Sequence, residues 1–280
     1  PGQSHADNIG NGLYPTDKIE DRAALCFSCH IGHADKIASH EIMGAGHPRL
    51  SFELDTFTIL QPAHFVVDED YREAKSHADS VTVWALGQIE ASYQTVRLIE
   101  NHLKNGGLFP ELSLFDCHSC HHPMSNLKWQ PSDRVGLPPG AVRLNDAGFV
   151  MLIPIDEIVP GKPVGMKAAI SELQMAVHND DDINASLNSL RSRINALEGR
   201  VRVSNLDEDQ LLEKVLSMAA RGQFHDYVAA EQAVMAIDLL MSSVGDRDAK
   251  SPWLDKVYES VSNEDIFDPF DFTDQFVELN

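Results

Sequence analysis

Two short motifs with the same pattern constrain this chain more than any other feature of its sequence. They are Cys26–His30 and Cys117–His121, and both follow the pattern C-x-x-C-H. Two cysteines separated by two residues can form thioethers with the two vinyl groups of one porphyrin, and the next histidine can bind the iron from one face. The pattern therefore predicts two covalent c-type haems, with His30 and His121 as proximal iron ligands.

The two motifs use every cysteine of the chain, namely Cys26, Cys29, Cys117 and Cys120. No cysteine is left for a disulfide or for a separate cysteine-rich metal site. The alternative is a single zinc site built from both C-x-x-C pairs, because zinc accepts four thiolate ligands. The histidine that directly follows each pair favours haem attachment over zinc.

The charge balance limits the partners that the chain can have. Its 280 residues include 22 Lys and Arg against 43 Asp and Glu, which gives a net charge of −21. Nucleic acid and anionic membranes repel such a protein, so a redox partner protein with a basic docking surface is expected instead. No run of eighteen apolar residues is present, so no membrane span is predicted.

The chemistry of haem attachment also predicts a location. Haem thioethers are normally made outside the cytoplasm, and the sequence begins at Pro1 with neither an initiator methionine nor a signal peptide. These observations predict a mature chain in the periplasm, or exported in another way, from which the signal has been removed.

Each iron has a second axial position, and eleven of the 13 histidines precede position 123. His47 is the first candidate for this distal position, because a glycine before it and a proline after it let the backbone approach a flat ring. His122 is the second candidate, followed by His64 and His5. With so many histidines, ligation by two histidines is favoured over histidine with methionine, for which Met43 and Met124 are the nearest candidates.

The other histidines outside the motifs are expected to be ordinary surface or hydrogen-bonded side chains. They are His33, His40, His77, His102, His118, His178 and His225. Arg49 either pairs with a haem propionate or is an ordinary surface cation.

Hydrophobic periodicity predicts a mostly α-helical protein. The clearest helix covers 80–104, where apolar residues recur every three or four positions. Further helices are expected around 170–177, over 183–197 with Gly199 as its end, after 207–209, over 228–244 and after Pro252. Residues 1–25 are expected to be loop with at most one helical turn, and the proline-rich stretch 131–165 to be extended. Within that stretch, 149–153 is either a short strand or a buried segment that lies on a haem face.

A change in composition near 160–165 divides the chain. Residues 1–164 are predicted to hold the two haems, with long loops, and residues 165–280 to form a helical bundle; a single shared core is compatible with this division. The acidic, aromatic stretch 263–280 is expected to lie along the surface as a tail.

The segments Ala45–Leu54 (AGHPRLSFEL) and Phe115–His122 (FDCHSCHH) together resemble the multihaem cytochrome c family related to cytochrome c554. The resemblance covers residues 1–135. It implies a mostly helical, exported protein that carries electrons through haems ligated by two histidines and packed in pairs. The chain departs from cytochrome c554 itself in having two attachment motifs where that protein has four.

Electron transfer is therefore the favoured function, because iron with two axial protein ligands has no open site. The alternative is a haem enzyme of the peroxidase or nitrogen-oxide reductase type, in which one iron lacks a distal ligand and His64 acts as a general acid. A third possibility is a sensor or scaffold, with the heptad-like residues 183–197 as a partner-binding module.

Overall fold

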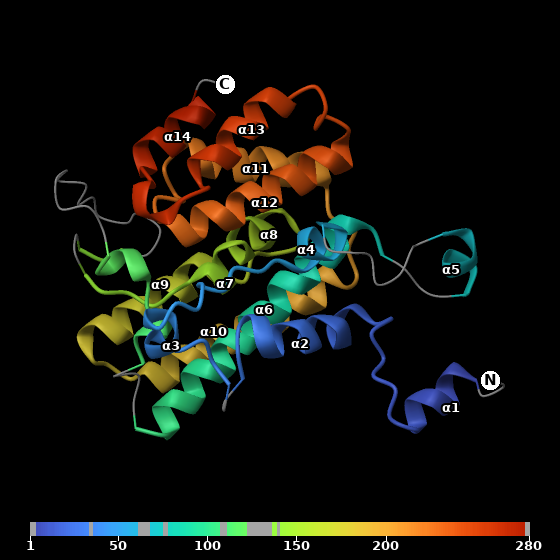
Figure 1. Ribbon diagram of the computed structural model, residues 1–280, viewed down its shortest axis with the longest axis horizontal. Helices are drawn as coiled ribbons and strands as arrows, with labels where there is room; N and C mark the ends of the chain where they lie inside the picture. The colour runs from blue at the N-terminus through green and yellow to red at the C-terminus, as the bar shows by residue number, and fades with distance from the viewer. Residues whose placement is uncertain are drawn as a thin grey trace.

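The computed structural model describes residues 4–33, 36–60, 68–74, 78–106, 111–121, 136–138 and 141–277. These residues form helices, and their β-structure is limited to two isolated bridges, His33 with Lys36 and Phe115 with Leu144. The prediction of a mostly α protein is confirmed at this level. Figure 1 shows the helices packed around one long central helix, with the C-terminal helices together on one side.

The central helix is α6 (Ser80–Lys104), which has the bounds that its periodicity predicted. Asp79 caps its first turn by accepting a hydrogen bond from the Thr82 N–H, and the helix ends at Asn105. Its buried side chains include Trp84, Ile89 and Val96. The helices that contact it are α2 (Ile19–His30), α4 (Leu54–Leu60), α7 (Ala147–Val150), α8 (Leu152–Ile158), α10 (Ile183–Val201) and α12 (Tyr227–Val244).

The N-terminal region is more helical than predicted. Residues 1–25 were expected to be loop with at most one turn, but α1 covers His5–Gly10 and the twelve-residue α2 reaches His30. Packing decides this, because α2 has a weak apolar pattern and gains its stability from burying Ala23 and Phe27. The short helices α3 (His40–Gly44) and α5 (Glu69–Ala74) follow, and Figure 1 shows α1 and α5 at the edge of the molecule.

The prediction that 131–165 is extended is wrong for its central part, and the possible strand over 149–153 is absent. This segment forms α7 and α8, whose residues Phe149 to Ile155 are buried. Pro154 lies in the first turn of α8, where a backbone N–H has no partner within the helix, so the proline causes no loss there. The segment is buried, as the other alternative proposed, whereas its expected place on a haem face stays a prediction.

The second half of the chain forms the predicted helices. They are α9 (Met166–Asn179), α10, α11 (Glu208–Ala220), α12 and α13 (Ser251–Ser260). Gly199 does not end α10, which continues to Val201. The prediction that 263–280 is a surface tail is wrong. In this segment η3 (Glu264–Ile266) is followed by α14 (Pro269–Val277), in which Phe272 and Phe276 are buried.

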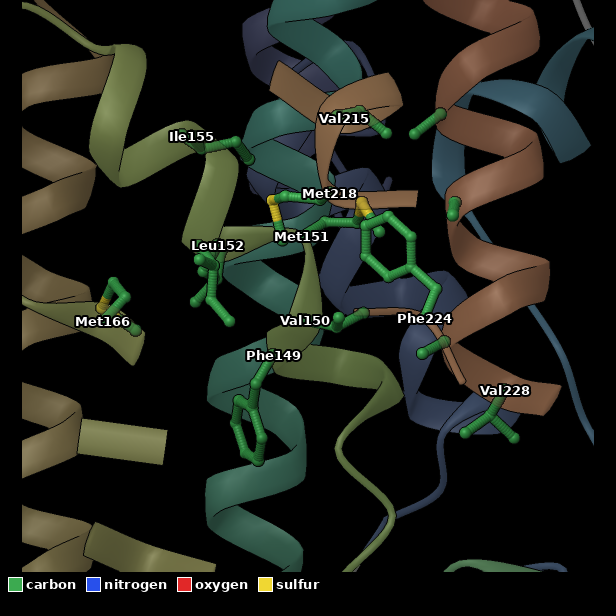
Figure 2. Packing of buried hydrophobic residues seen from close by; sticks show 14 of the residues in the cluster. Phe149, Val150, Met151, Leu152, Ile155, Met166, Val215, Met218, Phe224 and Val228 are labelled. Atoms are coloured by element: carbon green, nitrogen blue, oxygen red, sulfur yellow. The ribbon is translucent and has the colours of Figure 1, made fainter. Parts of the chain in front are cut away.

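The largest hydrophobic core contains residues from both sides of the predicted boundary at 164/165, from Val81 to Phe276. Figure 2 shows part of this cluster, in which Met151 from the first half lies among Met218 and Phe224 from the second half. The two halves of the described chain therefore share this core, beside a smaller cluster of Ala23, Phe27, Leu54, Val83 and Ala91 that belongs to the first half alone.

One described helix, α12, is long and apolar enough to cross a membrane when only its length and composition are considered. Within the protein, 72% of this helix is buried. It therefore packs as a core helix does, and the described residues contain no clear membrane span.

Candidate functional site

The first motif lies at the C-terminal end of α2. Cys26, Cys29 and His30 are spaced i, i+3 and i+4, so the two thiols and the imidazole share one face of the helix. Cys26 and His30 are partly buried and Cys29 is exposed. Phe27, which lies between the two cysteines, is buried against the core and holds the helix in place. The helix thus presents three potential ligand atoms in one direction.

The imidazole of His30 packs against an aromatic side chain. Phe52 stacks on it, with 4.1 Å between the ring centroids and 22° between the planes. Phe52 also meets Phe27 edge to face at 5.5 Å. Partial burial lowers the pKa of His30, which favours the neutral imidazole that can bind a metal. The sequence did not identify Phe52, although it lies in the segment Ala45–Leu54 that carried the resemblance.

The second motif lies on the short 3₁₀ helix η2 (Cys117–Ser119). Cys120 follows this helix as its C-cap, and its N–H donates to the Cys117 carbonyl at 3.1 Å. The His121 N–H donates to the Cys117 carbonyl at 2.7 Å. Local hydrogen bonds therefore give this motif a compact geometry in place of the α-helix seen in the first motif.

A buried ion-pair network anchors the second motif. The Arg143 guanidinium lies 3.0 Å from Asp116, which directly precedes Cys117, and 3.2 Å from Asp226 at the start of α12. The Asp116 N–H also donates to the Arg143 carbonyl at 2.9 Å. These contacts fix the motif to the helices of the second half.

The two motifs border the same cavity. It is lined by His30 and Cys117, has a volume of about 140 Å³ and is partly open to solvent. This volume is below the roughly 300–1,000 Å³ that is typical of ligand pockets. Its apolar wall includes Ile37, Met43, Leu98, Ile99 and Val228, from α3, α6, α12 and the chain before α3. An imidazole, a thiol, an apolar wall and Arg49 are the residue types that a porphyrin site uses, although the cavity itself is smaller than a typical ligand pocket.

Arg49 lies at this cavity but is already paired. Its guanidinium contacts Glu231 at 2.5 Å and Glu264 at 3.1 Å, and it lies over the Tyr227 ring at 5.2 Å. The sequence had offered a haem propionate or solvent as its partner, and it did not identify the two carboxylates. Arg49 therefore joins the loop after α3 to the C-terminal helices.

Of the four distal candidates, only His47 has a described side chain. His47 is exposed, and its Nδ1 lies 2.7 Å from the Pro48 carbonyl. A carbonyl can only accept a hydrogen bond, so Nδ1 carries the proton and Nε2 is left to act as a metal ligand, as in many histidine–metal sites. His122 and His64 lie outside the described residues, as does the side chain of His5.

The structure brings together two other histidines. The ring of His40, at the start of α3, lies 6.2 Å from the ring of His121, with 32° between the planes. The sequence had assigned His40 to the ordinary histidines, and no local pattern marks it as a ligand. His118, from the same group, is hydrogen-bonded as expected, with Nε2 3.1 Å from the Glu264 carbonyl.

The zinc alternative requires the two thiol pairs to meet. All four cysteines are described and are free of disulfides, and the described residues contain no group of three or more Cys, His, Asp or Glu side chains placed to hold a metal ion. Burial raises the pKa of the Cys26 and Cys117 thiols in the metal-free protein.

In comparisons with known proteins, no family model, curated protein or solved structure matches the chain.

Proposed function

We propose that this protein is a dihaem c-type cytochrome that transfers electrons, and that it is related to the multihaem cytochromes that its motifs resemble. The observation that carries the proposal is that His30 of the first C-x-x-C-H motif and Cys117 of the second line one cavity of about 140 Å³. The fold thus brings two distant copies of the same pattern to one partly apolar cavity, as two neighbouring haems would require.

The residues of the chain have separate roles in this proposal. Cys26 and Cys29 attach one haem, and Cys117 and Cys120 attach the other. His30 and His121 are the proximal ligands, and the Phe52 ring holds the His30 imidazole in one orientation. When bound, haem iron supplies one-electron redox chemistry. The apolar wall around the cavity lowers the local dielectric and limits the access of water.

The net charge of the protein supports a redox partner protein with a basic docking surface. A net charge of −21 attracts a redox protein with a basic docking surface and increases the rate of their encounter at low salt. Thioether attachment outside the cytoplasm places the protein in the periplasm or another exported location. The redox partner and the exported location both depend on the proposed haems. If no haem is attached, neither is expected.

The mass of the intact protein tests haem attachment. The purified protein should exceed the polypeptide mass by two haems. A variant with both Cys26→Ala and Cys29→Ala should retain one haem, and so should a variant with both Cys117→Ala and Cys120→Ala. A mass equal to that of the polypeptide, with or without one zinc ion, would contradict the proposal.

Carbon monoxide separates an electron carrier from an enzyme. If both irons have two protein ligands, carbon monoxide added to the reduced protein should leave its visible spectrum almost unchanged. Fast binding of one carbon monoxide per chain would show an open iron, and would favour a haem enzyme of the peroxidase or nitrogen-oxide reductase type.

A further inference from the structure

We propose that His40 is the distal ligand of the second haem iron, opposite His121. This assignment rests on the proposed function, because it requires the haem attached to Cys117 and Cys120. It makes His40 a functional residue that local sequence patterns do not reveal.

The spacing of the two rings is the first argument. A bond between a metal and an imidazole nitrogen is about 2 Å long, and the ring centre lies roughly 1 Å beyond that nitrogen, so two imidazoles on opposite sides of one metal have centres about 6 Å apart. The ring centres of His40 and His121 are 6.2 Å apart. The 32° between their planes is compatible with this arrangement, because rotation of a ring about its bond to the metal leaves the bond intact.

The anchoring of α3 is the second argument. The His40 N–H donates to the Glu111 carboxylate at 3.0 Å, across 71 positions of sequence. The same carboxylate oxygen accepts hydrogen bonds from the N–H and hydroxyl of Ser113, in η1 (Leu112–Leu114), just before the second motif. Ser39 caps α3 by accepting from the Ile42 N–H. The start of α3 is therefore attached to the segment that leads into Cys117.

The environment of the two rings is the third argument. Both side chains are exposed, and within the described part of the chain neither imidazole makes a hydrogen bond. The partly buried His118, by contrast, uses its Nε2 to contact the Glu264 carbonyl. The contacts around His40 position its backbone and leave its ring available to a ligand.

The test uses the holoprotein and its ferric absorption and paramagnetic resonance spectra. His40→Ala should retain two haems by mass but convert one of them from low spin to high spin. After reduction, the variant should bind one carbon monoxide per chain where the wild type binds none. His40→Met should restore six-coordination and raise the potential of that haem, because thioether sulfur favours reduced iron. His178→Ala, a change at an exposed histidine of α9, should leave all these properties unchanged.

A single-haem background identifies which iron is affected. In the variant with Cys26→Ala and Cys29→Ala, the remaining haem is the one attached to the second motif. His40→Ala should make this haem high spin, whereas His47→Ala should leave it low spin. If His40→Ala leaves it low spin, or if His47→Ala makes it high spin, the assignment of His40 is wrong while the proposed function stands. Absence of haem from the wild-type protein would instead overturn the proposed function.

Discussion

Two carboxyl groups are buried close to the first motif, at Glu53 and Asp55. The Glu53 carboxylate accepts hydrogen bonds from the Asp55 and Thr56 N–H groups, both at 2.8 Å, and so caps the start of α4. Burial, with the charge of Glu53 nearby, raises the pKa of Asp55 to about 7. Such a group favours its protonated form in the folded protein and its charged form in the unfolded chain.

Asp55→Asn should therefore stabilise the protein at high pH. The pKa of Asp55 is above its ordinary value of 3.8, so the fold loses stability as the pH rises from about 4 to 7, and the full penalty is present above 7. Asparagine has no charge to bury, so the free energy of unfolding of the variant should exceed that of the wild type by on the order of 2 kcal/mol at pH 8. Urea unfolding at pH 8 and pH 4 measures this difference.

The gain should disappear at pH 4, where Asp55 is protonated. Asp255→Asn, at an exposed position of α13, serves as the control and should change little at either pH. An equal effect of Asp55→Asn at both pH values would show that its charge is not responsible.

Helix α14 packs into the core, although the sequence predicted a surface tail at this end of the chain. Its residues Phe272 and Phe276 pack at 5.0 Å from each other, and Phe276 meets Trp253 of α13 edge to face at 5.5 Å. The Trp253 indole N–H donates to the Gln275 carbonyl at 2.9 Å. The helix also contacts α11. These contacts make α14 part of the core of the bundle.

Phe272→Ala should destabilise the protein by about 3–5 kcal/mol, because it removes a large, fully buried side chain and leaves a cavity. The matched control is Phe270→Ala in the same helix, where the side chain is 47% exposed and the cost should stay near 0.5 kcal/mol. Thermal or urea unfolding of both variants measures the difference. Equal, small effects would show that α14 lies on the surface, as the sequence first indicated.

At the scale of the whole molecule, buried charges connect the two halves. Arg143 joins Asp116, beside the second motif, to Asp226 at the start of α12. Arg49 joins the loop after α3 to Glu231 and Glu264. Both sets of contacts meet near the second motif, so the C-terminal helices determine where that motif lies.

Arg143→Ala should cost about 3–5 kcal/mol of unfolding free energy, because it leaves two buried carboxylates without their cation. Arg247→Ala removes an ion pair with Asp238 in which the arginine side chain is 50% exposed, and it should cost about 1 kcal/mol or less. Urea unfolding of both variants gives the comparison, and 1 M salt should weaken only the contribution of Arg247. A small cost at Arg143 would show that the two halves are held together by the apolar core alone.

Local patterns in the sequence predicted the two attachment motifs and the longest helices. A C-x-x-C-H motif is a local pattern, and so is the periodicity that predicted α6 at 80–104 and the helix over 228–244. Such patterns are visible because residues three or four positions apart share one face of a helix. Local composition gave a wrong prediction for the centre of the proline-rich stretch 131–165. Whether a helix tolerates proline depends on its position in the helix, and Pro154 lies in a first turn.

The contacts between distant residues became visible only in the fold. It placed His40 beside His121, Arg49 between Glu231 and Glu264, and Phe272 in the core. Each of these outcomes depends on contacts between segments far apart in the chain, whose free energy comes from burial and charge pairing and leaves no short repeat in the sequence. For that reason the motifs predicted the proposed attachment residues, whereas the distal ligand proposed for the second iron came from the fold.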